Sequence, residues 1–185
     1  MSDHISLETL STEELIQTAA TADAAGNYQI RESARKTLIS LGNGAVDVLI
    51  HALIDESAKV RCNAAVVLGK IKAFDAFGAL GSRLQIDADS DVRSAVATAL
   101  GKIHNPDLKL DSVPILISAL RDPAPNVRIF AATALGRIGD RRAIETLATV
   151  AGEHTCNSDF LTAIDRIRGA QQTSTDGART LSFAP

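Results

Sequence analysis

The side chains able to act as nucleophiles in this 185-residue chain do not form a catalytic motif. Cys62 and Cys156 lie far apart, and neither has a partner histidine on the same predicted helix face; His154, two residues before Cys156, is a single neighbour. No serine stands in a Gly-x-Ser-x-Gly turn, and there is no glycine-rich loop that could hold a phosphate. Two cysteines at this spacing predict neither a metal site nor a disulfide framework, so we interpret both as buried free thiols.

Positive charges recur at one position of a repeated sequence pattern. Lys70, Lys102 and Arg137 each follow a Leu-Gly pair, and Arg166 takes the matching place near the C-terminus. A cation near the C-terminus of a helix is stabilised by about 0.3–1 kcal/mol through the helix dipole, which explains the row without a ligand. Alternatively, the row binds an acidic segment of a partner protein through complementary charge. The sequence leaves both interpretations open.

A second group of residues is predicted to point away from the protein core beside this row. Ile129 and Phe130 are adjacent, large and apolar, which is unusual for two outward positions. Either the helix is rotated so that one of them packs in the core, or the pair anchors a ligand or partner. The predicted partner-binding surface on the concave face comprises Asn63, Val66, Lys70, Thr98, Lys102, Ile129, Phe130, Thr133 and Arg137.

Acidic and basic side chains also recur in pairs six residues apart. The three pairs are Asp55–Arg61, Asp87–Arg93 and Asp122–Arg128. In each pair the aspartate is predicted to lie in a turn and the arginine at the start of the following helix. If the repeats stack, each arginine can reach the aspartate of a neighbouring repeat, so we interpret these residues as a structural ladder.

These residues are positioned by helices that recur along the chain. In the stretch 127–140, Val127, Ala131, Leu135 and Ile138 recur at spacings of three and four, which predicts one buried face of an α-helix. Gly136 lies inside this helix, where glycine costs about 1 kcal/mol relative to alanine but is useful if another helix must approach closely. Related stretches stand at 30–43, 60–73, 92–105 and 156–169. A second helix is predicted before each of the five, at 12–23, 45–54, 75–85, 112–121 and 142–152.

A helical unit that recurs about every 30 residues predicts stacked helix-turn-helix repeats. The first and last copies depart from the pattern and are interpreted as caps. The long connection 104–111 is interpreted as either a tolerated insertion or a functional loop. Residues 1–11 are predicted to be flexible and residues 169–185 to form a disordered tail. We expect an all-α, right-handed α-solenoid in a single domain, 12–168, with repeats at about 12–42, 44–72, 75–104, 111–139 and 142–168.

The repeated strings resemble one known family of helical repeats. The string Val-Arg-x2-Ala-x3-Leu-Gly-Lys/Arg-Ile occurs at 60–71 and 127–138, and Val96 replaces its alanine in the copy at 92–103. Together with the Asp–Arg pairs, these strings are similar to HEAT repeats of the short bacterial kind named after phycobilisome lyases. The resemblance implies an armadillo-like helical fold but no single function, because the family includes scaffolds, chaperone-like lyases and enzymes.

The resemblance also raises metal and pigment chemistry. Some HEAT-repeat hydroxylases bind iron through adjacent His-Glu pairs, but none of the histidines here is followed by glutamate, so no metal site is expected at His4, His51, His104 or His154. Bilin lyases of this kind hold an open-chain tetrapyrrole, whose propionates would suit Lys70, Lys102 and Arg137. An aromatic content of only 3% weighs against stacking on such a pigment.

We therefore favour a non-enzymatic scaffold or adaptor that binds another protein on its concave surface and carries no cofactor. One alternative is a bilin lyase subunit or a chaperone-like protein that handles phycobilisomes, for which a bilin would be the ligand. A second alternative is a structural protein that self-associates through imperfect caps. A monomer or weak oligomer is expected.

Charge and hydropathy limit the kinds of partner and the location that we expect. The net charge of −3 and the pI of about 5.8 argue against a nucleic-acid partner. Apolar runs are shorter than the roughly 20 residues that span a bilayer, so no membrane partner is expected. The N-terminus lacks a basic region followed by an apolar segment, so it does not predict a signal peptide, and we expect a cytoplasmic protein.

Overall fold

The computed structural model describes residues 7–21, 28–153 and 158–180. Within these ranges the chain is all-α, and its one β feature is an isolated bridge between Asn105 and Leu110. The predicted fold class, an α-solenoid of helix-turn-helix repeats, is confirmed. No helix in the described ranges is both long enough and apolar enough to cross a membrane.

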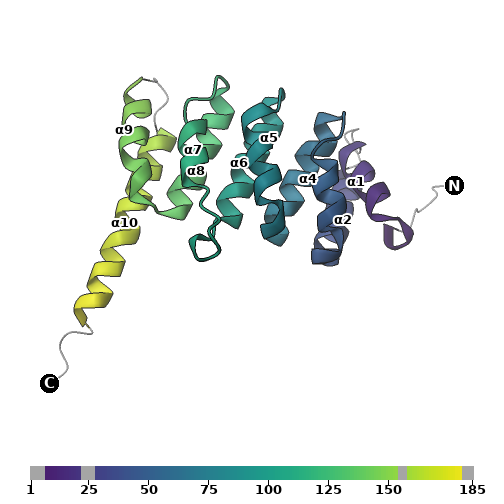
Figure 1. Ribbon diagram of the computed structural model, residues 1–185, viewed down its shortest axis with the longest axis horizontal. Coiled ribbons are helices and arrows are strands. Elements are labelled where there is room, and N and C mark those ends of the chain that lie inside the picture. Colours follow the sequence, from purple (N-terminus) through teal and green to yellow (C-terminus); the bar gives the residue numbers. More distant parts are fainter. Residues whose placement is uncertain (1–6, 22–27, 154–157, 181–185) are drawn as a thin grey trace. The chain divides into compact units, whose positions relative to one another are not determined.

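The helices follow one another as antiparallel hairpins, which are visible in the ribbon (Figure 1). Each of the five hairpins is preceded by a short 3₁₀ turn, at Leu7–Thr9, Gly42–Ala45, Phe74–Ala76, Pro106–Leu108 and Arg141–Ala143. The hairpins are α1 (Thr12–Thr21) with α2 (Tyr28–Leu41), α3 (Val46–Ala52) with α4 (Ala58–Ile71), α5 (Phe77–Ile86) with α6 (Ser90–Ile103), α7 (Val113–Ala119) with α8 (Pro125–Ile138), and α9 (Ile144–Glu153) with α10 (Ser158–Thr180).

These helices group into two compact units. Unit 1 spans Met1–Ile103 and contains α1 to α6, and unit 2 spans His104–Pro185 and contains α7 to α10. The two units are described one at a time below. That the five repeats form one continuous domain stays a prediction.

The helix ends follow from local chemistry. Helix α8 begins at Pro125, whose missing N–H would have no helical partner at this position. It ends at Gly139, which adopts φ = 79°, a left-handed conformation that glycine reaches without steric cost. The sequence therefore sets both limits of this helix.

The core is built mainly from leucine and alanine. The valine at the third position of each regular second helix is at most 1% exposed, as the periodicity predicted, in Val60, Val92 and Val127. Alanine at the other core positions leaves room for neighbouring helices to approach closely, because its side chain adds little radius. The largest side chains below 2% exposure are Leu15, Leu38, Leu49, Leu53, Leu68, Leu80, Leu100, Ile103, Leu116, Leu120, Leu135 and Leu147.

Close helix packing explains the glycine inside the second helices. In unit 1, a Cβ added to Gly69 of α4 would lie 2.7 Å from the Cα of Ala99 in α6. In unit 2, a Cβ added to Gly136 of α8 would lie 2.9 Å from the Cα of Ala163 in α10. Both distances are too short for real Cβ contacts, so these positions require glycine, as was expected for Gly136.

The end of the solenoid differs from the prediction. Helix α10 continues to Thr180, so residues 169–180, predicted to be disordered, continue the last helix. Extending an existing helix adds one hydrogen bond for each residue fixed and avoids the cost of nucleation, and Ala170 and Gln171 are compatible with it. Residues 181–185 lie outside the described residues, as do 1–6 of the predicted flexible N-terminus; Leu7–Thr9 form a 3₁₀ turn.

Candidate functional site

Each arginine of the three Asp–Arg pairs closes the turn that precedes its own helix. The arginine Nη1 donates to two consecutive carbonyl oxygens of that turn, at 2.8–3.1 Å. These bonds give hydrogen-bond partners to backbone carbonyls of the turn, which lies beyond the last residue of the preceding helix. The acceptors are Asp55 and Glu56 for Arg61, Asp87 and Ala88 for Arg93, and Asp122 and Pro123 for Arg128.

The aspartates fix the same turns from the other side. In each, the carboxylate accepts the amide hydrogen two residues later, from Ser57 at 2.8 Å, Asp89 at 3.0 Å and Ala124 at 2.8 Å. Such Asx turns hold a short loop in place without other packing. The six-residue spacing therefore encodes a clamp within each repeat, a role that the sequence analysis missed.

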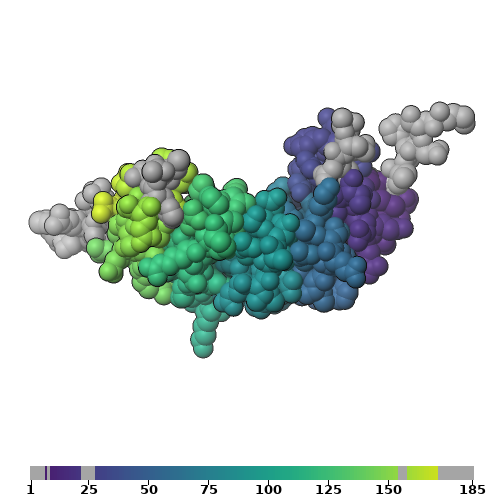
Figure 2. All heavy atoms as spheres, turned by 90° about the horizontal axis from the view of Figure 1, so that it is seen from above, coloured from purple at the N-terminus to yellow at the C-terminus, as the bar shows by residue number. Residues whose placement is uncertain are grey.

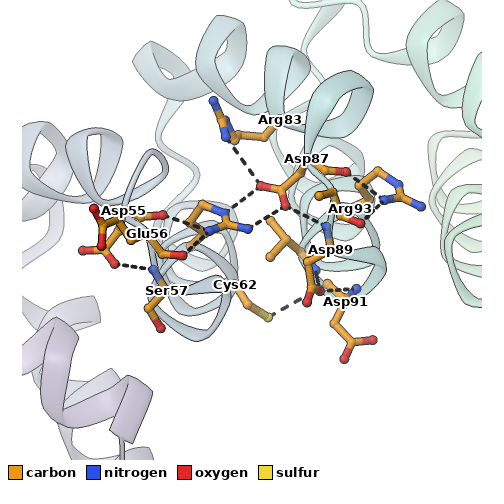
Figure 3. A network of polar contacts seen from close by, with 12 residues as sticks. Asp55, Glu56, Ser57, Cys62, Arg83, Asp87, Asp89, Asp91 and Arg93 are labelled. Carbon is orange, nitrogen blue, oxygen red and sulfur yellow. Dashed lines mark hydrogen bonds and ion pairs between the residues drawn. The ribbon is translucent and has the colours of Figure 1, made fainter.

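One arginine and one aspartate also join neighbouring repeats of unit 1 (Figure 3). Arg61 of α4 donates from Nε and Nη2 to the two carboxylate oxygens of Asp87, both at 2.8 Å. The Asp87 side chain is 1% exposed and that of Arg61 is 12% exposed. Arg83 Nη1 lies 3.6 Å from the same carboxylate. The predicted contact between repeats is thus present at this pair, in bidentate form.

The neighbouring hydrogen-bond donors determine the pKa of the Asp87 carboxyl. Burial raises the pKa of the Asp87 carboxyl, but hydrogen bonds from Arg61 and the Asp89 amide outweigh burial, so its pKa lies below the ordinary value of 3.8. The Arg61 pKa is raised, chiefly by its hydrogen bond to Asp87. The pair is therefore charged at neutral pH.

The lowered pKa of the Asp87 carboxyl makes the stability of unit 1 depend on pH. Because the folded state holds the Asp87 carboxyl at a lower pKa than the unfolded state, its contribution is complete above pH 3.8 and is lost as pH falls through the folded pKa. We expect the difference in melting temperature between the wild type and Asp87→Asn to be constant from about pH 7 to pH 5 and to narrow below about pH 4. Circular dichroism melts across this range measure it. A difference that stayed constant down to the most acidic sample would contradict the assignment.

The second helices of unit 1 carry part of the predicted partner-binding surface. Val66 and Thr98 are half-buried, and the Thr98 hydroxyl donates to the Ser94 carbonyl within α6. Lys70 is exposed, with Nζ 3.9 Å from the Glu32 carboxylate of α2. The stem of Lys102 passes 3.6 Å from where a Cβ on Gly69 would lie. That Lys70 and Lys102 lie on the same side of the α4–α6 pair stays a prediction from their matching positions in the repeat.

Asn63 does not belong to this surface, contrary to the prediction. Its side chain is buried, and the residue is 5% exposed. The amide nitrogen donates to the carbonyls of Ala19 at 3.0 Å and Lys59 at 2.9 Å, and the amide oxygen accepts two bonds from the Arg35 guanidinium. Asn63 thus joins α1, α2 and α4 as a packing residue, because a buried amide must be hydrogen-bonded.

The second helix of unit 2 presents the remaining predicted residues. On α8, Phe130 is 44% exposed and Ile129 is partly buried, so neither occupies the core. The Thr133 hydroxyl donates to the Ile129 carbonyl at 2.9 Å, and Arg137 is exposed in the last turn. Because Arg137 belongs to unit 2, its alignment with the lysines of unit 1 stays a prediction.

The connection 104–111 is an ordered loop that protrudes from the surface of unit 2 (Figure 2). The Asn105 side chain accepts from the amides of Asp107 and Leu108, and its backbone pairs with Leu110. The base is held by Arg142, which donates to Asp111 at 2.7 Å and to Asp140 at 2.7 Å. The hydrogen bonds from Arg142 lower the pKa of both carboxyl groups. The long connection is thus a hydrogen-bonded structure.

The metal and thiol groups considered from the sequence can be assessed where the structure describes the chain. No group of three His, Cys, Asp or Glu side chains is placed to hold a metal ion in those residues. Burial raises the pKa of the Cys62 thiol, which disfavours the nucleophilic thiolate. His154 and Cys156 lie outside the described residues.

Comparison with known proteins agrees with this geometry. The sequence profile of HEAT repeats matches residues 12–101 and 77–155. A chain from the complex of CpcE and CpcF of phycocyanin lyase from Nostoc sp. PCC7120 is similar in structure, with a TM-score of 0.73, 17% identity, and coverage of 84% of this chain and 96% of that one. A designed armadillo repeat protein matches with a TM-score of 0.54 and 17% identity, over 85% of this chain and 80% of that one. No curated protein sequence matches the chain.

Proposed function

Because the chain belongs to the HEAT-repeat family, we propose that it is a non-enzymatic scaffold that binds another protein through the outward side chains of its second helices. The observation that carries this proposal is the pair Ile129 and Phe130, two large apolar side chains outside the core of unit 2, with the exposed cation of Arg137 two turns further along α8. The cores of protein interfaces are enriched in aromatic side chains and arginine. In unit 1, Val66, Lys70, Thr98 and Lys102 provide a comparable surface.

The charge of this surface indicates the chemistry of the partner. Lys70, Lys102 and Arg137 each stand in the last turn of a second helix, where the helix dipole also stabilises them. Their positive charges favour an acidic segment as the partner's contact. Charge reversal at the three positions should slow association with that partner and flatten its salt dependence, measured by surface plasmon resonance with the protein captured from the native host.

Phe130→Ala should separate binding from stability. The side chain is 44% exposed, so its removal costs little packing, and the melting temperature should change by no more than about 2 °C. Dissociation of the partner should become about tenfold faster or more, because an anchor that leaves a pocket affects mainly the off-rate. Differential scanning fluorimetry and surface plasmon resonance measure the two effects.

Leu161→Ala is the matched control for that substitution. Leu161 is 47% exposed, also on a second helix of unit 2, but outside the proposed surface. It should leave the dissociation rate unchanged. A large fall in melting temperature for Phe130→Ala would show that Phe130 is a packing residue. Equal effects of Phe130→Ala and Leu161→Ala on the dissociation rate would show that Phe130 is not an anchor for the partner.

A bilin lyase subunit or phycobilisome-handling protein is the second candidate. It is supported by the similarity in fold to the phycocyanin lyase chain and by three cations that could meet the propionates of a tetrapyrrole: Lys70, Lys102 and Arg137. Few aromatic side chains are available to stack on a pigment. Mixing the protein with phycocyanobilin and recording the absorbance distinguishes this candidate, since a bound bilin changes its visible spectrum and an unbound one does not.

Self-association is the third candidate, and the C-terminal repeat supports it. Leu161 stands five residues after the start of its repeat pattern, where Ala65, Ala97 and Ala132 are buried in the regular repeats. An exposed leucine at a position that otherwise packs could accept a second chain. Sedimentation velocity at two concentrations, with Leu161→Glu as the variant that should remain monomeric, tests this.

A further inference from the structure

Unit 1 contains a groove on its first helices, away from the surface of second helices described above. The groove has a volume of about 530 Å³ and is formed by α1, α3, the turn after α3 and the start of α4. This volume lies within the range of roughly 300–1,000 Å³ that is typical of ligand sites. Its lining residues are Glu13, Ile16, Gln17, Asp47, Val48, His51, Ala52, Asp55 and Val60.

The groove combines an apolar floor with a polar rim. Ile16 is 3% exposed, Ala52 is 8% exposed and Val60 is 1% exposed, so the deepest surface is aliphatic. Glu13, Gln17, Asp47 and His51 are exposed at the rim.

The rim is acidic because α1, α3 and the turn after α3 each contribute one carboxylate to the groove, from Glu13, Asp47 and Asp55. Asp47 and His51 are four residues apart on α3, and Asp55 follows four residues later in the turn. The Asp55 carboxylate is oriented by the Ser57 amide, which donates to Oδ1 at 2.8 Å. Glu13 and Gln17 face the groove from α1, also four residues apart. No lysine or arginine is among the lining residues, but Arg61 lies close enough to Asp55 to interact with its charge. Glu13 and Asp47 therefore supply the negative charge of the rim that no lining cation offsets.

We propose that this groove binds an arginine side chain presented by an extended peptide segment of a partner protein. The aliphatic stem of arginine would lie on the floor of Ile16, Ala52 and Val60, which shields this apolar surface from water. The guanidinium would meet the carboxylates of the rim, and its planar set of donors suits two separate carboxylates better than an ammonium does. The partner's chemistry here, basic and apolar, is opposite to the acidic segment proposed for the second helices.

A peptide-binding measurement with neutral and charged probes tests the proposal. The probe is a fluorescein-labelled peptide, Gly-Ser-Leu-Arg-Leu-Ser-Gly, and its control replaces arginine by citrulline, which has the same shape without the charge. Fluorescence anisotropy at low ionic strength should show saturable binding of the arginine peptide. The citrulline peptide should bind about tenfold more weakly or not at all, since a charge-assisted contact is lost.

Two substitutions in the protein locate the site, each with a matched control in the same unit. Gln17→Arg places a cation in the groove and should weaken binding of the arginine peptide by about tenfold. Gln85→Arg, on the exposed face of α5, should leave its binding unchanged. Asp47→Asn should weaken binding of the same peptide by about threefold. Asp75→Asn, which is also exposed but lies outside the groove, should leave its binding unchanged. All four positions are at the surface, so the melting temperatures should stay close to that of the wild type.

Several outcomes would overturn the proposal. They are an absence of saturable binding, equal binding of the arginine and citrulline peptides, and equal effects of the matched controls. If free arginine displaced the labelled peptide as effectively as unlabelled peptide does, the groove would be a site for a small molecule. Self-association that Gln17→Arg abolishes, without peptide binding, would assign it to a second copy of the chain. Phe130→Ala should leave peptide binding unchanged, so failure of the scaffold surface and failure of this groove are distinguishable.

Discussion

Replacing Asp87 with alanine should lower the free energy of unfolding of unit 1 by about 3 kcal/mol. The substitution removes both acceptors of the Arg61 guanidinium and leaves a charged side chain that is only 12% exposed without its anion. It also removes the acceptor for the Asp89 amide and the carboxylate near Arg83. The cost is that of an uncompensated buried charge together with a lost turn bond. Urea denaturation followed by circular dichroism measures it.

Asp111→Ala is the matched control for this prediction. Asp111 also accepts from an arginine, Arg142 at 2.7 Å, and also accepts an amide two residues later, from Val113 at 3.0 Å. The difference is exposure, because the Asp111 side chain is 35% exposed and that of Asp87 is 1% exposed. Water can replace a lost ion pair at the surface, so Asp111→Ala should cost clearly less. Equal losses for the two variants would show that burial does not set the strength of the Asp87 contact.

The sequence predicted the helices well because one periodic pattern determines both their limits and their buried face. The valines in the first turn of the regular second helices, Val60, Val92 and Val127, are buried, and Gly139 follows α8 in the left-handed conformation. These features depend on neighbours within one helical turn, which a sequence pattern contains directly. The extension of α10 to Thr180 was not predicted, because polar composition alone does not show that a preceding helix has already provided the nucleus.

The candidate site was predictable where a position's role depends on its helix face, and less so where it depends on partners from other helices. Phe130 and Arg137 are exposed as their helical spacing indicated. Asn63 was placed on the same face but is buried, because Arg35 and the Ala19 carbonyl, far away in the sequence, satisfy its amide. The groove of unit 1 was missed for the same reason, since its two rims come from α1 and α3. The spacing of Asp47, His51 and Asp55 was a signal for one rim alone.

Gly69→Ala should destabilise unit 1 by about 2 kcal/mol, although alanine is the better helix former. The new Cβ would lie 2.7 Å from the Cα and 2.8 Å from the Cβ of Ala99. Since one of these atoms is backbone, a side-chain rotation cannot relieve the contact, and α4 and α6 must separate along their shared face. Overpacking of this kind costs about 1–3 kcal/mol, and the gain in helix propensity of about 1 kcal/mol offsets only part of it. Urea denaturation measures the net change.

Gly78→Ala provides the control of opposite sign. Gly78 lies in α5 of the same unit, and a Cβ there would meet nothing within 4 Å, so only the gain in helix propensity and the reduced freedom of the unfolded chain remain. This variant should be more stable than the wild type by about 0.5–1 kcal/mol. In unit 2, Gly136→Ala should be destabilising like Gly69→Ala, because its Cβ would lie 2.9 Å from the Cα of Ala163. If Gly69→Ala and Gly78→Ala changed stability in the same direction, close approach of the second helices would not be the reason for the glycine in the repeated Leu-Gly string.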